Sequence, residues 1–352
     1  MNDFENEIND DRFLCKVANF TRKLGKTVLG RNMKRFKPSF LHQNYYSLVN
    51  KLIDIGIVTL ARIAIDSTLI EVHGSSYQKG TKGRGKKKVA LGYRLSVAFD
   101  LDSKLPVAYI LTFGHEHDSR FLVPLIETIK SRYGLVPERV VMDRGYYGQD
   151  YFNYLTENGS EFEIPLKKYG YIKEMFQNHD RGKYKHDKQL KIEYLDDYID
   201  ISGYGKLRVI WIVHGNTEDL MPDDLENNEW WGILTNRADL SPVDIILAYK
   251  ERWEIEVFFR STKQRMALDK LPGTDFRQVQ THIFFVFVAY ILLMLVRHLA
   301  DFDDNPLRIE LKFIQDKALF VKAVFVMKGR RLNVHFTGKG WLYHHEEEIS
   351  LV

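Results

Sequence analysis

Two aspartates, each directly after a short apolar segment with the composition of a β-strand, most strongly constrain how this chain can fold. Asp66 follows the segment IAI, and Asp143 follows VVM. A carboxylate in such a position lies at the carboxyl edge of a sheet, where α/β proteins bind ligands and where burial without a partner is costly. The alternative is that each aspartate is an ordinary capping or turn residue. Two such positions favour an α/β fold with a site between its strands.

The elements predicted between these aspartates indicate a mixed sheet. The segment ARIAIDSTLIEV is a predicted strand that ends near Asp66, and YRLSVAFD and PVAYILTF are two further strands joined by the turn DLDSK. A helix is expected from Arg120 to Arg132, with Asp118 or Ser119 as its cap. ERVVMD is then a short buried strand. The resulting order is strand, strand, strand, helix, strand.

Changes in composition divide the chain into five expected segments. With 352 residues the chain exceeds the size at which a single core stops growing, so several parts are expected. Residues 1–60 are predicted to be a short, basic, helical region, and residues 61–169 the first part of the α/β core. Residues 170–239 are polar with many strand patterns, which predicts a β-rich insertion. Residues 240–300 complete the core, and residues 301–352 are the C-terminal region.

A helix is expected to begin after Ser241 and to run to about Leu268, because Ser, Pro and Asp occupy its N-cap, first and third positions. Four polar residues of this helix follow one another at offsets of three, four and seven: Tyr249, Arg252, Glu256 and Lys263. At about 100° per residue they fall within an arc of roughly 60°. The alternative is a solvated face with a common Arg–Glu pair, worth a few tenths of a kcal/mol.

The three acids Asp66, Asp143 and Glu256 offer what a pair of magnesium ions needs, namely hard oxygen ligands with open positions for water and phosphate oxygens. Two such ions, about 4 Å apart, hold the attacking and leaving oxygens of a phosphodiester displacement. We therefore expect the three carboxylates to converge within about 4 to 8 Å of one another. Arg252 and Lys263 are cations that would repel such ions, so we do not expect them to bind metal.

The sequence resembles a known family, the DDE transposases of bacterial insertion sequences, particularly insertion sequence family four. The third acid of that family lies in a helix with the spacing Tyr-x2-Arg-x3-Glu-x6-Lys, and YKERWEIEVFFRSTK fits every fixed position. The resemblance extends from about Tyr45 to Leu299 through IAIDST, HEHDSR, VVMDRGYYG and GILTN. It implies a ribonuclease H-like mixed sheet flanked by helices, with the β-rich insertion between the second Asp and the Glu.

The resemblance also implies an activity, a cofactor and partners. Such a transposase cuts double-stranded DNA at transposon ends and joins the ends to target DNA, with two Mg²⁺ or Mn²⁺ ions and, since two ends must meet, a homodimer in the active complex. Tyr249, Arg252 and Lys263 look toward transposon-end DNA in that family. The N-terminal region is shorter than the end-recognition domain of many relatives, which puts sequence-specific binding and full activity in question.

Two further groups of residues have competing interpretations. Trp231, with Trp230, occupies the region where some relatives stack a flipped base, and packing in the core is the alternative for at least one of them. His115 and His117 flank an acid before the predicted helix, as metal ligands would. The helix start that follows favours capping or packing, so they are left out of the ligand set.

Charge along the chain is more informative than the net charge of +4. Lys16–Lys37 carries eight basic residues and no acid, and Lys79–Lys88 carries six and no acid. Either run alone is an ordinary solvated loop, but together they favour a phosphate-rich partner, with Lys86, Lys87 and Lys88 as DNA-binding candidates. GTKGRGKK is not a phosphate-binding loop, because Lys takes the place of the final Ser or Thr.

Composition also bears on the compartment. Cys15 is the only cysteine, which excludes an internal disulfide and fits a reducing compartment. The acidic N-terminus lacks the pattern of a signal peptide, so a cytoplasmic protein is expected. The apolar segment Ile283–Val296 is shorter than the roughly 18 to 20 residues that cross a bilayer, so a buried helix and no membrane contact are expected.

Two alternatives to an active transposase remain. One is a truncated or domesticated relative that binds DNA without transposing it; the intact acids argue against a decayed site. The other is a nuclease of another ribonuclease H-like class, which would not need the polar residues from Tyr249 to Lys263.

Overall fold

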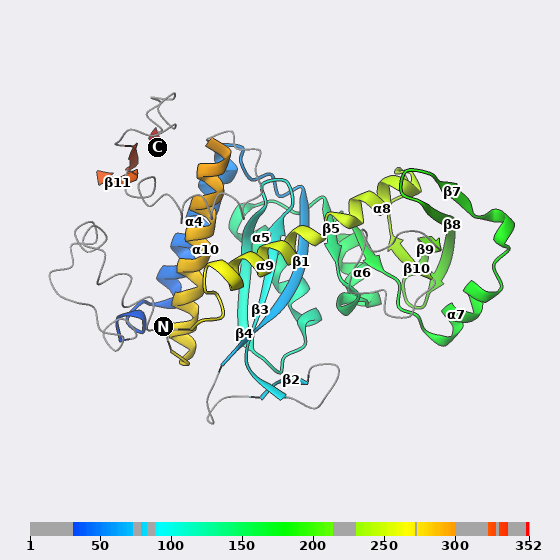
Figure 1. Cartoon of the computed structure of the whole chain (residues 1–352), viewed down its shortest axis with the longest axis horizontal. Coiled ribbons are helices and arrows are strands. Elements are labelled where there is room, and N and C mark those ends of the chain that lie inside the picture. The colour runs from blue at the N-terminus through cyan, green and yellow to red at the C-terminus, as the bar shows by residue number, and fades with distance from the viewer. Residues whose placement is uncertain are drawn as a thin grey trace. The chain divides into compact units, whose positions relative to one another are not determined.

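The computed structural model describes residues 31–72, 79–82, 89–213, 230–271, 273–299, 323–328, 331–336 and 350–351. The chain divides into two compact units: Pro38–Arg260, and Met1–Lys37 with Ser261–Val352. Figure 1 shows their helices and strands. These two units differ from the five segments expected from composition, whose boundaries stay predictions. Cys15 and the basic run before residue 31 lie outside the described residues.

The unit Pro38–Arg260 begins with an amphipathic helix, α4 (Pro38–Asp54). Its buried side chains recur at helical spacing: Leu41, Tyr45, Tyr46, Val49 and Leu52. The Tyr45 hydroxyl donates a hydrogen bond to the Pro106 carbonyl at 2.5 Å, and its ring centroid lies 5.0 Å from that of Tyr109. The helix expected among residues 1–60 is therefore confirmed, and its apolar face packs on the strand that contains Pro106 and Tyr109.

Five strands form the centre of a mixed sheet: β1 (Arg62–Glu71), β3 (Val89–Asp100), β4 (Leu105–Phe113), β5 (Arg139–Met142) and β6 (Glu161–Pro165). β1 pairs antiparallel with β3, and β3 with β4. On its other side β1 pairs parallel with β5, and β5 with β6. The short strand β2 (Lys79–Lys82) pairs with β3. The order β4-β3-β1-β5-β6, with three antiparallel strands followed by two parallel ones, is the expected ribonuclease H-like core.

Two helices provide the crossovers that parallel strands require, α5 (Leu122–Tyr133) before β5 and α6 (Gln149–Glu157) before β6. The buried side chains of α5 are Leu122, Leu125, Ile126 and Ile129. The expected cap, Asp118 or Ser119, was wrong. A 3₁₀ turn, η1 (Asp118–Phe121), precedes α5, and the His117 ring accepts a hydrogen bond from the Ser119 N–H. His117 is thus a capping residue.

The expected β-rich insertion is present, and it extends the core sheet. Its elements are α7 (Gly170–Gln177), η3 (Arg181–Lys183), β7 (Lys185–Asp187), β8 (Ile192–Ile201), β9 (Gly205–Val213) and β10 (Trp230–Thr235). β10 pairs antiparallel with β6 and with β9, so the added strands continue from the edge of the core. The described strands of this unit form one ten-stranded sheet.

The long helix expected from Ser241 to Leu268 is two helices, α8 (Pro242–Lys250) and α9 (Trp253–Arg265). The expected cap is confirmed, because the Ser241 hydroxyl accepts a hydrogen bond from the Asp244 N–H at 3.2 Å. Between the helices, the N–H groups of residues 252, 254 and 255 bond to carbonyls three residues back. This tighter winding breaks the helical projection between Tyr249 and the residues of α9.

The other unit contains α10 (Phe276–Leu299) and a small antiparallel sheet of β11 (Ala323–Lys328), β12 (Arg331–Phe336) and β13 (Ser350–Leu351). The Thr281 hydroxyl donates to the Met33 carbonyl at 3.0 Å, and the rings of Phe36 and Phe285 lie 5.7 Å apart. The segment before α4 therefore packs on α10.

The apolar helix α10 is longer than Ile283–Val296, the segment that was predicted to be too short to cross a membrane. By length and composition, Phe276–Leu295 is the one candidate span in the described part of the chain, and half of this window is buried. The prediction that this apolar helix is too short to cross a membrane was therefore wrong. Ile283, Phe287 and Ile291 are fully buried, as in the expected core helix, and an apolar core helix passes the same test as a membrane span.

Candidate active site

Asp66 and Asp143 are neighbours in the register of the parallel pair β1–β5. The last paired residues are Ile65 and Met142, so the two aspartates come next on strands about 4.8 Å apart and point to the same face. Asp66 does not end its strand as expected, because β1 continues to Glu71 and pairs Asp66 with Val97 of β3. What ends at Asp66 is the parallel ladder. The strand order therefore brings the two carboxylates together.

Backbone N–H groups orient both carboxylates. Asp66 Oδ1 accepts from the Ser67 N–H at 2.7 Å, and Asp143 Oδ1 accepts from the Gly145 N–H at 2.6 Å. The second contact requires glycine, since a Cβ on Gly145 would lie 2.8 Å from Asp143 Oδ1. Gly145 lies in the 3₁₀ turn η2 (Arg144–Tyr146), and Asp143 is the N-cap residue of this turn.

The charges of the two aspartates act on each other. Burial, first, and then the charge of Asp143 raise the pKa of Asp66 to about 7. Glu256 adds a smaller rise, while the Arg252 guanidinium and the Ser67 N–H oppose it. The charges of Asp143 and Glu256 thus both act on Asp66, and a divalent cation bound by these oxygens would relieve the repulsion. The two aspartates fit a hard cation by their chemistry.

Glu256 is engaged with an arginine. The Arg252 guanidinium donates a hydrogen bond to Glu256 Oε1 and lies 3.9 Å from Asp66 Oδ2, and its side chain is only 11% exposed. Within the ranges that the structure describes, no three His, Cys, Asp or Glu side chains are grouped to hold a metal ion. The convergence of all three acids into one ligand set therefore stays a prediction, and it requires Glu256 to exchange Arg252 for the ion.

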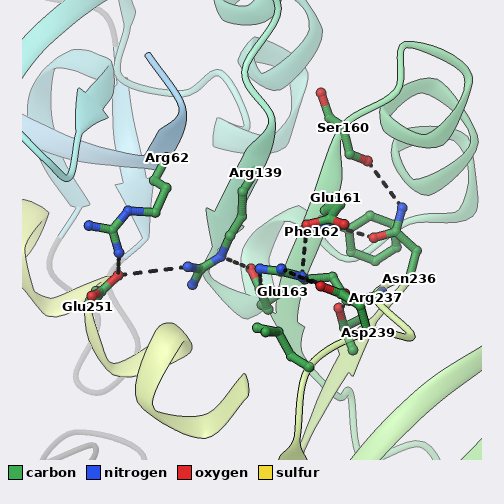
Figure 2. Close-up of polar contacts among 12 residues, drawn as sticks. Arg62, Arg139, Ser160, Glu161, Phe162, Glu163, Asn236, Arg237, Asp239 and Glu251 are labelled. Atoms are coloured by element: carbon green, nitrogen blue, oxygen red, sulfur yellow. Dashed lines mark hydrogen bonds and ion pairs between the residues drawn. The ribbon is translucent and has the colours of Figure 1, made fainter. Parts of the chain in front are cut away.

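Figure 2 shows the ion pairs that hold the break between α8 and α9 against the sheet. Glu251, in the break, lies 2.6 Å from Arg62 and 3.8 Å from Arg139, which occupy paired positions on β1 and β5. Lys104 contacts Glu254 at 3.1 Å. These contacts hold the break close to Asp66, which the Arg252 guanidinium approaches. The ion pairs were not predicted from the sequence, although both arginines precede the apolar strand segments by one residue.

A second polar cluster adjoins Asp66. Arg94 of β3 donates to Ser67 Oγ at 3.0 Å and lies 3.3 Å from Asp118. Burial raises the pKa of the Tyr146 hydroxyl, and the charges of Asp66, Asp143 and Asp118 add to the rise. Asp118 is therefore a fourth acid near the pair. From the sequence, Asp118 was predicted only as a helix cap, and no role was predicted for Arg94 or Tyr146.

Two aromatic DNA-binding candidates are buried. Tyr249 of α8 is 1% exposed, Trp231 of β10 is 8% exposed, and their ring centroids lie 6.1 Å apart. The Arg252 guanidinium carbon lies 5.8 Å from the Tyr249 ring centroid. Trp230 stacks on Phe176, with centroids 4.2 Å apart. Both tryptophans thus pack in this structure, and a base-stacking role for Trp231 stays a prediction that requires the ring to become exposed.

The basic DNA-binding candidates are only partly described. Lys263 is half-buried and follows Glu256 by two turns on the same side of α9. Lys86, Lys87 and Lys88 lie outside the described residues. His115 and His117 contact Glu116 and Asp118, at 3.4 Å and 3.2 Å, and both side chains are more than half exposed. That they are not metal ligands stays a prediction.

The geometry and the motifs agree with a known family. The model of the Transposase DDE domain family matches residues 60–292, which include Asp66, Asp143 and Glu256. Because the match covers more than half of the chain, the protein belongs to the Transposase DDE domain family. The family implies the use of divalent metal ions.

Named relatives are insertion sequence transposases. The chain is 25% identical to a probable transposase for insertion sequence element IS5377 of Geobacillus stearothermophilus, over 74% of this chain and 61% of the relative. It is 24% identical to a putative transposase for insertion sequence element IS4SA of Synechocystis sp., over 66% of this chain and 59% of the relative. The chain thus spans about three fifths of the length of these curated relatives.

Solved structures show weaker similarity. A piggyBac transposase synaptic complex with hairpin DNA aligns with 88% of this chain and 62% of that chain, at 10% identity and a TM-score of 0.48. A Marinitoga piezophila Argonaute with guide RNA aligns with 53% of this chain and 25% of that chain, at 12% identity and a TM-score of 0.25. The fold assignment rests on the strand order rather than on these similarities.

Proposed function

We propose that this protein is the DNA transposase of an insertion sequence, which cleaves phosphodiester bonds at transposon ends and transfers the released strand into target DNA. The observation that carries the proposal is that Asp66 and Asp143 each follow directly after the last pair of the parallel ladder, Ile65 and Met142. Family membership and the named relatives support it. The spacing from Tyr249 to Lys263 supports assignment to insertion sequence family four.

For the cofactor we propose two Mg²⁺ or Mn²⁺ ions bound by Asp66, Asp143 and Glu256. When bound, such ions hold the attacking and leaving oxygens of the phosphodiester and neutralise the charge that develops there. The raised pKa of Asp66 supports this set, because burial and then the neighbouring charge of Asp143 disfavour its ionised form in the absence of a cation. Glu256 completes the set when its carboxylate leaves Arg252, and the released guanidinium is then free to take phosphate oxygens.

For the partner we propose double-stranded DNA, at transposon ends and target, bound by a homodimer in the cytoplasm. Arg252 and Lys263 position phosphates in this proposal, and Lys86, Lys87 and Lys88 add to the basic surface. Tyr249 supports Arg252 through its ring. Trp231, which packs on Tyr249, holds β10 beside α8, and it stacks on a flipped base only if it becomes exposed.

The second candidate is a relative that binds DNA without transposing it. The chain matches only about three fifths of each named relative, so a relative's whole activity does not transfer automatically. A ribonuclease H-like nuclease of another class gains no such support. The two surviving candidates differ in catalysis, because only the transposase cuts DNA.

A nicking experiment separates them. The substrate is a supercoiled plasmid that carries the reading frame with its flanking DNA, incubated with the protein and Mg²⁺ or Mn²⁺. We expect nicking by the unmodified protein, none by Asp143→Asn or Glu256→Gln, and retained DNA binding by both variants. Glu157→Gln, which removes an exposed acid at the end of α6, is the control and should keep nicking. Binding without metal-dependent nicking would favour the second candidate, and nicking by Glu256→Gln would move the third ligand elsewhere.

A further inference from the structure

A surface of tyrosines and lysines lies directly after the Asp143 turn. We call Tyr147, Lys167, Tyr169, Tyr171 and Lys173 the tyrosine–lysine patch. Tyr147 follows Asp143 by four residues, and its ring centroid lies 5.9 Å from that of Tyr169. Tyr169 and Tyr171 are nearly parallel, with centroids 6.0 Å apart and an angle of 9° between their planes. Segments on either side of β6 thus form one aromatic group.

Two rings of this aromatic group are exposed to solvent. Tyr169 is 45% exposed and Tyr171 is 49% exposed. The residues that anchor α7 in the core are instead Ile172 and Phe176. Large aromatic side chains bury much area when they pack, so two adjacent exposed rings leave an unusual apolar area in contact with water.

The patch is basic as well as aromatic. The Lys167 ammonium lies 5.4 Å from the Tyr147 ring centroid, and Lys173 is exposed on α7, whose first turn contains no acid. Lys168 differs, because its ammonium covers the Trp230 ring at 4.2 Å and donates to the Trp230 carbonyl. Lys167 and Lys173 are thus the cations available to an outside ligand. Glu174 is the exposed acid nearest to them in sequence.

We propose that the tyrosine–lysine patch binds unpaired DNA bases next to the cleaved bond, with Tyr169 and Tyr171 stacking on bases and Lys167 and Lys173 contacting phosphates. The proposal rests on the proposed function, since it places this DNA beside Asp143. Proteins that hold single strands combine a basic surface with aromatic platforms, because every base has a face for stacking. Bases of intact duplex DNA are already stacked on one another, so aromatic platforms select unpaired nucleotides.

The partner is DNA rather than protein because of where the patch lies. Tyr147 directly follows the turn η2 that Asp143 caps, and its ring contacts that of Tyr169, so the patch adjoins the Asp143 turn. Unpaired nucleotides arise beside the cut whenever a strand is displaced or a base is flipped during strand transfer. The occupant we infer is therefore the DNA strand next to the cleavage position.

A binding experiment on the full-length protein tests this inference. The probes are a fluorescent oligothymidylate of about 12 nucleotides, within the roughly 4 to 16 that single-strand sites cover, and a blunt duplex of equal length. Buffer with EDTA removes catalysis from the readout. We expect Tyr169→Ala and Tyr171→Ala each to weaken oligothymidylate binding about five- to a hundred-fold, the equivalent of roughly 1–3 kcal/mol per stacked base. Duplex binding should change less than twofold.

Two variants make the test specific. Tyr169→Phe keeps the ring and should bind normally, which separates stacking from hydroxyl contacts. Tyr198→Ala removes a tyrosine that is 55% exposed on β8, outside the patch, and should also bind normally. Unchanged binding by the Tyr169→Ala and Tyr171→Ala variants would overturn the inference. So would equal losses on duplex and single strand, or an equal loss for Tyr198→Ala. Because this binding assay requires no cleavage, a loss of nicking and a loss of single-strand binding at the patch can be distinguished.

Discussion

The Arg252 guanidinium lies 3.9 Å from the Asp66 carboxylate. The same guanidinium donates a hydrogen bond to Glu256, so one cation contacts two of the three proposed metal ligands. At about 4 Å, two unit charges near a protein surface interact by roughly 4 kcal/mol. Arg252 therefore balances charge at the place where divalent ions are proposed to bind, and ions and arginine compete for the same carboxylates.

The first prediction follows from this competition. Arg252→Gln should bind Mn²⁺ about tenfold more tightly, equivalent to 1.4 kcal/mol, because Glu256 is released and a repelling charge is lost. Binding to transposon-end DNA should weaken, since a cation for phosphate oxygens is gone. Calorimetric titration with Mn²⁺ and a DNA-binding assay measure the two effects. Arg260→Gln is the control, because Arg260 is exposed on the same helix over the Trp253 ring. Weaker Mn²⁺ binding by Arg252→Gln would make Arg252 a structural support for Glu256.

The second prediction concerns pH. The pKa of Asp66 rises from 3.8 to about 7 in the folded protein, so between these values the folded state binds more protons than the unfolded chain. The stability of the metal-free protein should therefore fall as pH increases from about 4 to 7, by a few kcal/mol at most. Asp66→Asn has no such titration and should be more stable than the unmodified protein at pH 8. Urea unfolding across this pH range, with EDTA, measures the difference.

Adding Mg²⁺ at pH 8 provides the control for this second prediction. The ion should stabilise the unmodified protein by neutralising the paired carboxylates, and should stabilise Asp66→Asn much less. Parallel pH profiles for both proteins would mean that the charge of Asp66 is balanced in the folded state.

The third prediction concerns Gly145. A Cβ at this position would lie 2.8 Å from Asp143 Oδ1, so the carboxylate must rotate away. Because the atom that moves is the end of a side chain, Gly145→Ala should keep its thermal stability while it loses Mn²⁺ affinity and nicking. Gly170→Ala is the control, since nothing lies within 4 Å of its added Cβ. Normal metal affinity in Gly145→Ala would remove Asp143 from the ligand set.

The fourth prediction concerns the basic loop outside the described residues. Replacement of Lys86, Lys87 and Lys88 by alanine should flatten the slope of log affinity against log salt by up to about 3, at roughly 0.9 per released counterion. The exposed lysines Lys183, Lys185 and Lys188 give a matched triple control. An unchanged slope in the first triple variant would assign its loop to bulk solvent.

Local patterns predicted much of the fold and the central pair of the site. Short apolar segments before Asp66 and Asp143 predicted two buried strands, and the register of parallel strands then puts the acids side by side. The Ser241 cap was predictable for the same reason, because its hydrogen bond to the Asp244 N–H is made within one helical turn.

Features that depend on distant contacts were not predictable. The sequence around Glu251 is compatible with one continuous helix, but ion pairs to Arg62 and Arg139, far away in the chain, accompany a break there. β1 continues past Asp66 because β3 pairs along its whole length, which no pattern within β1 indicates. Trp231 is buried because β10 extends the core sheet, and the polar composition of the insertion gave no sign of this.

The last prediction concerns the buried ion pair in Figure 2. Glu163 of β6 is fully buried and lies 2.7 Å from Arg139, whose side chain is 6% exposed. Burial raises the pKa of Glu163, and the charge of Arg139 opposes the rise. Removal of one partner from such a pair costs about 3–5 kcal/mol when the remaining charge is uncompensated, and the contact of Arg139 with Glu251 at 3.8 Å lowers this cost. Glutamine has almost the same shape as glutamate but no charge. Glu163→Gln should therefore lower the free energy of unfolding by about 3 kcal/mol.

Urea unfolding of matched variants tests this pair. Glu161→Gln removes an acid of the same strand that contacts Arg237 at 2.8 Å but is 40% exposed, so its loss should stay below about 1 kcal/mol. Replacement of both partners, Arg139→Met with Glu163→Leu, should recover most of the stability, because no charge is then left buried. The double variant also lacks the Arg139 contact with Glu251, so its nicking should stay reduced although it is stable. Equal losses for Glu163→Gln and Glu161→Gln would show that water reaches the buried pair.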